Sequence, residues 1–132
     1  MPEQLTLADA AAIIAAGMAA AQTQDCAATL AVVDQGGHLL ALQRADGAPF
    51  GTVRFAERKA QTSAALGAPT SGLAGAVAAV PGLMSAAFDG IAFVGGGVPL
   101  RRDGALIGGV GVAGGLGDQD ERIAQAAAQG LK

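Results

Sequence analysis

Apolar residues recur at helical spacing in several stretches of the chain. The first predicted helix begins at Thr6, whose hydroxyl can cap a helix N-terminus, and runs to about Gln24. Its larger apolar side chains, Ile13, Ile14 and Met18, fall on one helical face. We therefore expect this helix to pack one side against a core.

Three more helices are predicted further along the chain. The second spans Thr52–Leu66 and carries a stripe of small apolar residues, Val53, Ala56, Ala60 and Ala64. Thr70 caps a short third helix, which stops at Pro81-Gly82 because proline cannot continue a helix. A last helix covers Asp118–Gln129.

Short apolar and β-branched runs predict strands, and two pairs of them are joined by tight-turn signals. One signal is Asp34-Gln35-Gly36-Gly37 and the other is Asp103-Gly104, where glycine supplies the positive φ that such turns need. We therefore expect two antiparallel hairpins. The five predicted strands are Thr29–Val33, His38–Arg44, Ile91–Val94, Val98–Arg102 and Ala105–Val112.

The order of these elements is helix, hairpin, two helices, strands ending in a hairpin, and helix. Antiparallel hairpins interleaved with helices predict an α+β sandwich, in which a central antiparallel sheet of about five strands carries helices on its faces. The length of 132 residues and the absence of a repeat or linker indicate a single domain over residues 1–132.

Composition adds an expectation about assembly. Hydrophobic residues make up 52% of the chain and charged residues only 14%, where about 25% charged is usual. With so few charges, apolar surface must remain after the core is filled, so we expect a homo-oligomer. The alternative is that abundant alanine reflects compositional bias alone.

Several classes of partner are disfavoured. The net charge is −3, no cluster of Lys and Arg is present, and the chain has no Trp or Tyr, so nucleic acid is not an expected partner. No apolar run approaches the length of a membrane span. Cys26 is the only cysteine, which excludes an internal disulfide and fits a cytoplasmic protein.

Lys59 is the cation most suited to chemistry. It lies in the middle of the second predicted helix, in the stripe that contains Phe55 and Thr62, so it is predicted to point towards the sheet. A buried lysine is costly unless paired, and its pKa falls easily, which suits proton transfer. Arg44 and Asp46 could flank it. The alternative is a structural ion pair or a solvated helix face.

Two glycine stretches could hold an anion. Gly95–Gly97 beside Pro99, and Gly111–Gly117 ahead of the last helix, can present bare backbone N–H groups in a concavity. No Gly-Lys-Ser/Thr follows either stretch, which disfavours nucleotide binding. Close packing of strands against helices explains the glycines equally well.

His38 is the only histidine, so a two-histidine metal site is excluded. It begins a predicted strand directly after a turn. A neutral imidazole can bind haem iron, which makes His38 a possible haem ligand. The alternative is a surface histidine that only makes hydrogen bonds.

Five segments carry motifs in a fixed order: Val32–Ala48, Glu57–Thr62, Gly96–Pro99, Gly108–Gly115 and Asp118–Glu121. Through these motifs the chain resembles the GlcG/HbpS-like family over about Leu5 to Ala128. Two positions depart from the family pattern: Ala45, where Met is frequent, and Ala113, where Ser is common. The loss of the serine hydroxyl puts any role it plays in a ligand pocket in doubt.

The resemblance implies a profilin-like sandwich that assembles into dimers or larger rings, up to octamers. Family members are associated with haem binding or degradation, with glycolate and diol catabolic operons, and with the C-terminal part of PduO-type proteins. The first hypothesis is therefore a haem-binding or haem-handling protein, with haem as a possible cofactor and His38 as a possible ligand.

The second hypothesis is a cofactor-free lyase or isomerase that acts on a small organic acid. Lys59 would serve as acid/base or electrophile, and Asp46 or Glu57 would orient it. Arg44 would hold a carboxylate of the substrate, while the backbone N–H groups of Gly96 and Gly97 steady a developing oxyanion. A third hypothesis is a purely structural or regulatory binding subunit. The predicted ligand-binding residues are Arg44, Gly96, Gly97, Pro99 and Gly114. We therefore expect the Arg44–Asp46 loop, the helix that carries Lys59 and the Gly96–Pro99 bend to converge around one cavity.

Overall fold

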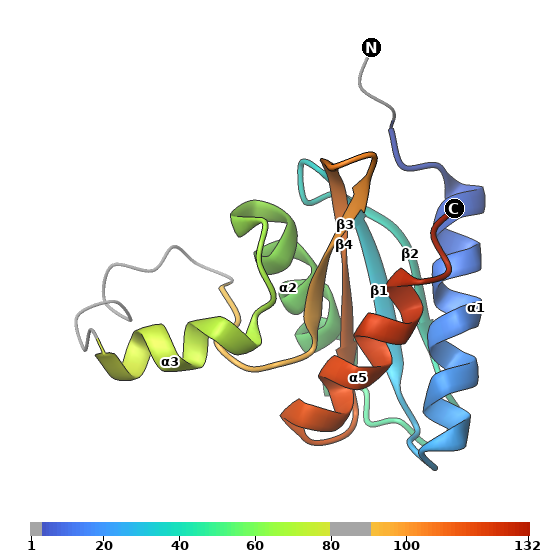
Figure 1. Cartoon of the computed structure of the whole chain (residues 1–132). Helices are drawn as coiled ribbons and strands as arrows, with labels where there is room; N and C mark the ends of the chain where they lie inside the picture. Colours follow the sequence, from blue (N-terminus) through green and yellow to red (C-terminus); the bar gives the residue numbers. More distant parts are fainter. Residues whose placement is uncertain (1–3, 80–90) are drawn as a thin grey trace.

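The computed structural model describes residues 4–79 and 91–132, which form a sheet with helices on both faces (Figure 1). Helix α2 covers one face of the sheet, and α1 and α5 cover the other. This confirms the predicted α+β class. The described elements are α1 (Leu7–Thr23), β1 (Thr29–Asp34), β2 (Leu39–Arg44), α2 (Gly51–Leu66), α3 (Ser71–Ala79), β3 (Gly97–Arg102), β4 (Ala105–Ala113) and α5 (Gly117–Ala128).

The sheet of the described residues has four strands in the order β2-β1-β4-β3, with every neighbouring pair antiparallel. The expectation of about five strands is wrong, because Ile91–Val94 is not a strand. Its backbone bonds to side chains instead: the Ala92 N–H donates to the Thr62 hydroxyl, and the Val94 carbonyl accepts from the Thr70 hydroxyl.

Both predicted hairpins are confirmed. Asp103 and Gly104 have φ values of 51° and 81°, the pair of positive φ angles that a two-residue turn between twisted strands needs. In the β1–β2 turn, the Asp34 carboxylate accepts hydrogen bonds from the backbone N–H groups of Gly36 and His38. These turns set the register of the two hairpins.

The start of α1 agrees with its local signal. At α1 the Thr6 hydroxyl accepts from the Asp9 N–H and the Asp9 carboxylate accepts from the Thr6 N–H, which is a complete capping box. Helix α3 begins directly after Thr70, but the predicted cap is wrong, because the Thr70 hydroxyl donates to the Val94 carbonyl and accepts from the Gly97 N–H. The predicted stop at Pro81-Gly82 lies outside the described residues.

Glycines allow α2 to lie directly on β4. A Cβ atom on Gly109 would overlap the carbonyl oxygen of Ala60, and one on Gly111 would overlap that of Ala56. The facing residues of α2 are small and buried, as Ala56, Ala60 and Ala64 show. At these positions the alternative of close strand–helix packing is confirmed.

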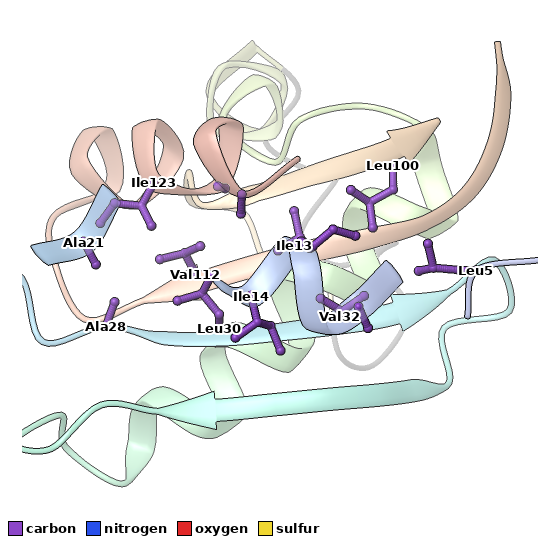
Figure 2. Close-up of a cluster of buried hydrophobic side chains, with 14 of the residues drawn as sticks. Leu5, Ile13, Ile14, Ala21, Ala28, Leu30, Val32, Leu100, Val112 and Ile123 are labelled. Carbon is purple, nitrogen blue, oxygen red and sulfur yellow. The ribbon is translucent and has the colours of Figure 1, made fainter. Parts of the chain in front are cut away.

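The larger hydrophobic core fills the opposite face of the sheet, beneath α1 and α5 (Figure 2). Branched residues of β1 and β4 meet branched residues of the two helices there, and the side chains are removed from solvent. This arrangement fixes where α5 begins, and α5 carries one half of the site described next. The labelled members include Ile13, Ile14, Leu30, Val32, Leu100, Val112 and Ile123.

Candidate functional site

Lys59 of α2 is buried, as the stripe of the second predicted helix indicated. Only 4% of the residue is exposed. Its Nζ donates to the Val112 carbonyl oxygen at 2.9 Å and to Asp120 Oδ2 at 3.1 Å. The ammonium thus sits where α2, the end of β4 and the start of α5 meet.

Asp120 is the second half of this buried ion pair. It lies in the first turn of α5 and is 2% exposed. Its other oxygen, Oδ1, accepts from the Gly115 N–H at 2.8 Å, so both carboxylate oxygens have donors. Because both partners are removed from water, each compensates a charge that would otherwise be costly to bury.

The expected orienting carboxylates do not contact Lys59; the carboxylate that does is Asp120. Glu57 lies two residues before Lys59 on the same helix, and positions i and i+2 point in different directions. Asp46 is exposed in the loop after β2. The pairing of Asp120 with Lys59 was not predicted, although an acidic residue in a helix's first turn directly after a glycine run was a usable signal.

A cavity of about 340 Å³ opens beside the ion pair. Its walls come from the start of α2, the segment before β3, the end of β4 and the first turn of α5. An ammonium has three N–H donors, and the described partners of Lys59 use two of them. One donor therefore remains for a ligand. The described lining is Pro49, Thr52, Phe55, Lys59, Val94, Ala113, Gly114, Gly115 and Asp120.

The Gly96–Pro99 bend contacts Lys59 but differs from the expected oxyanion site. A Cβ atom on Gly96, whose φ is 129°, would come within 2.8 Å of Lys59 Nζ. The Gly97 N–H donates to the Thr70 hydroxyl at 2.9 Å, so it is not free to steady an oxyanion. Pro99 has no N–H and pairs with Gly109 within the sheet.

The structure brings only some of the predicted binding residues together. Gly114, with a φ of 136°, lines the Lys59 cavity. Arg44 is exposed at the end of β2, and neither it nor Asp46 is among the described lining residues. The loop that carries them reaches the cavity only through its later part, at Pro49.

His38 lies at the other end of the sheet. Its side chain is 81% exposed, and its Nδ1 is 3.2 Å from Asp34 Oδ1. Hydrogen bonds from the His38 backbone, and from its ring, lower the pKa of the Asp34 carboxyl. A second cavity of about 340 Å³ adjoins this pair. Leu5, Leu40 and Ile107 form the apolar part of its wall, and Gln4 and Gln35 form a polar part.

The two cavities are far apart in one molecule. The Lys59 cavity is lined by Ala113, which pairs with Thr29 at the start of β1, whereas Asp34 ends that strand. Five residue steps along a strand cover roughly 17 Å. His38 therefore cannot act on a ligand held by Lys59 in the same molecule.

The described residues, 4–79 and 91–132, offer neither a metal centre nor a membrane span. They contain no group of three or more His, Cys, Asp or Glu side chains that could hold a metal ion. They also contain no helix long and apolar enough to cross a membrane.

Comparisons with known proteins agree on one group. The model of the family described as haem-degrading protein HbpS-like matches residues 5–129. Protein GlcG of Escherichia coli is 40% identical over 109 residues, which cover 79% of this chain and 77% of GlcG. The solved structure of a double mutant of Streptomyces reticuli HbpS is similar with a TM-score of 0.92 and 38% identity, over 100% of this chain and 90% of that one. A PduOC–haem complex is similar with a TM-score of 0.90 and 32% identity, over 98% and 96%.

Proposed function

The chain belongs to the HbpS-like family of haem-degrading proteins, and from this membership we propose that it binds haem and acts as a haem-handling protein. The similarity to the PduOC–haem complex, which extends over nearly the whole chain, supports a haem ligand. The residues of this chain must then offer an iron ligand and a wall for the macrocycle.

The Asp34–His38 pair carries the proposal. A histidine that binds a metal through one ring nitrogen usually donates the other N–H to a carboxylate, which fixes the tautomer. Here Nδ1 faces Asp34 Oδ1, which leaves Nε2 for an iron atom. The adjoining cavity of about 340 Å³ is smaller than a whole haem, so it would hold one edge of the macrocycle.

These residues fit haem in three respects. His38 would hold the iron, Asp34 would orient the imidazole, and the apolar wall formed by Leu5, Leu40 and Ile107 would contact the macrocycle. When bound, haem supplies redox-active iron. Because His38 is exposed, the opposite face of the macrocycle would need cover from a second molecule of the chain.

A hemin titration tests the proposal. We expect the Soret band of hemin to shift on binding to the wild-type protein, and the shift to be lost in His38→Ala. Asp34→Asn should keep the fold and weaken binding about tenfold or more, as loss of a partner to a metal-binding histidine does. An unchanged hemin spectrum with wild-type protein would remove the proposal, and full binding by His38→Ala would remove His38 as the ligand.

A second function is favoured by one observation, the burial of Lys59 against Asp120 beside a cavity. Lyase or isomerase chemistry on a small organic acid could use Lys59 as acid/base, with Asp120 as the carboxylate that orients it. Full turnover by Lys59→Met on the true substrate would contradict this mechanism.

A further inference from the structure

The charge balance of the Lys59 cavity indicates what it binds. Among its described lining residues, Lys59 and Asp120 are the two with charged side chains, and they form an ion pair at 3.1 Å. The site is therefore neutral before any ligand enters. We propose that this cavity binds a small neutral carbonyl compound with an apolar body, and that it discriminates against carboxylates.

The Lys59 ammonium has one N–H donor left for a ligand. Lys59 lines the cavity, and its described partners, the Val112 carbonyl and the Asp120 carboxylate, take two of its three N–H donors. The third donor is buried with the ammonium, and a buried donor without a partner is costly. A carbonyl oxygen in the cavity satisfies this donor. The Gly115 N–H does not compete, because it donates to Asp120.

The charge of the Lys59–Asp120 pair disfavours an anionic ligand. A carboxylate would bring a second negative charge to a lysine that Asp120 already compensates, which leaves the buried group of three with a net charge of −1. The cation that sequence analysis assigned to a substrate carboxylate, Arg44, is not among the described lining residues. A neutral acceptor takes the same hydrogen bond without this cost.

The walls and the size of the cavity restrict the body of the ligand. The walls beside the ion pair are apolar, from Pro49, Phe55, Val94 and Ala113, and they favour a hydrocarbon body. The absence of a side chain at Gly96 lets the segment before β3 lie directly against Lys59. A side chain at this position would collide with the amine and with the Val112 carbonyl. The space of about 340 Å³ suits a compound of small size.

This inference concerns the same cavity as the second proposed function and competes with it, because a small organic acid enters as a carboxylate near pH 7. It is independent of haem. Binding is therefore measured without turnover. The probes are benzamide and benzoate, which have the same shape and differ in charge. The full-length protein is titrated with each, and the backbone amide resonances of Gly114, Gly115 and Asp120 are followed by NMR.

We expect benzamide to shift these resonances and to bind at least about tenfold more tightly than benzoate. Asp120→Asn keeps a side chain of the same shape and leaves the Lys59 charge uncompensated. In that variant the preference should reverse, so that benzoate binds at least as tightly as benzamide. Asp103→Asn makes the same chemical change in an exposed turn outside the cavity and should keep the wild-type preference.

The wild-type comparison decides the matter even if Asp120→Asn does not fold. Equal or tighter binding of benzoate, or no shift at Gly114 and Gly115 with either probe, overturns the inference. An unreversed preference in folded Asp120→Asn overturns the charge argument on which it depends. A protein that still shifts the Soret band of hemin would then keep its proposed haem function, so the two failures are distinguishable.

Discussion

Lys59 and Asp120 depend on each other at the scale of single residues. Lys59→Met leaves the Asp120 carboxylate buried without its cation, and such a loss costs about 3–5 kcal/mol. Replacing both, as Lys59→Met with Asp120→Leu, removes both charges, so we expect the double variant to be more stable than the sum of the single losses implies. A double-mutant cycle by urea unfolding measures the coupling, and strict additivity would contradict a shared ion pair.

Asp34 gives an acid dependence with a defined sign. Its pKa is lowered in the folded state by hydrogen bonds from the His38 backbone, with further bonds from Gly36 and the His38 ring. A lowered folded pKa stabilises the protein above the ordinary aspartate value and loses that contribution as the pH falls through the folded pKa. Asp34→Asn should thus lower the free energy of unfolding at pH 7 by less than about 1 kcal/mol, since the carboxylate is partly exposed.

The difference in the free energy of unfolding between wild type and Asp34→Asn should shrink as the pH falls below about 4, the ordinary range of the aspartate pKa. Chemical unfolding at a series of pH values measures it. A difference that stays constant down to the most acidic conditions would show that the Asp34 charge does not contribute.

The helical spacing around Lys59 predicted that this side chain is buried, but it did not predict which residue pairs with it. The helical stripe needs only local spacing, whereas Asp120 is 61 positions away and meets Lys59 only because α5 packs beside the end of β4. Asp46 and Glu57 were nearer in sequence and therefore seemed better partners. The pairing is a property of the tertiary fold.

At the scale of elements, the contact between α2 and β4 depends on bare backbone. Gly111→Ala would place a methyl group against the Ala56 carbonyl, which the helix cannot avoid without moving off the sheet. We expect a loss of at least about 1–3 kcal/mol from overpacking. Gly72→Ala in α3 is the matched control, because a Cβ there meets no atom within 4 Å. Thermal unfolding of both variants measures the difference, and equal stabilities would contradict the packing account.

The helices and hairpins were predictable because their signals are local. The capping box at Thr6 and the Asp103-Gly104 turn depend on neighbouring residues only, and both appear in the structure. The strand expected at Ile91–Val94 was wrong because its backbone bonds to the hydroxyls of Thr62 and Thr70, from other elements. Apolar composition does not reveal such bonds.

At the scale of the whole molecule, the fold separates two sites that the sequence could not place. The expectation was that the Arg44–Asp46 loop, the Lys59 helix and the Gly96–Pro99 bend surround one cavity. The helix and the bend do meet, but Arg44 and Asp46 are not among the described residues of that cavity. His38 lies at the other end of β1, beside a cavity of its own. The haem and carbonyl proposals can thus be tested separately.

The homo-oligomer remains a prediction, and the structure indicates which surface to test. Phe50 is 82% exposed and Leu116 is 81% exposed, and each is next in sequence to a residue that lines the Lys59 cavity. Phe55 and Val94, which line it, are also exposed. Large apolar side chains grouped at one end of a molecule mark an interaction surface, because their exposure to water is unfavourable.

Light scattering coupled to size exclusion measures this assembly. We expect the measured molar mass of the wild-type protein to exceed that of one chain. The molar mass of the double variant Phe50→Ser with Leu116→Ser should fall towards that of one chain as the protein is diluted. Leu7→Ser is the control, since Leu7 is exposed on α1, on the opposite face of the sheet from α2. If a second copy does cover these side chains, it also closes the Lys59 cavity from water, so the double variant should weaken benzamide binding while Leu7→Ser leaves it unchanged. A wild-type chain that is monomeric at every concentration would contradict the prediction and leave the four side chains to the ligand alone.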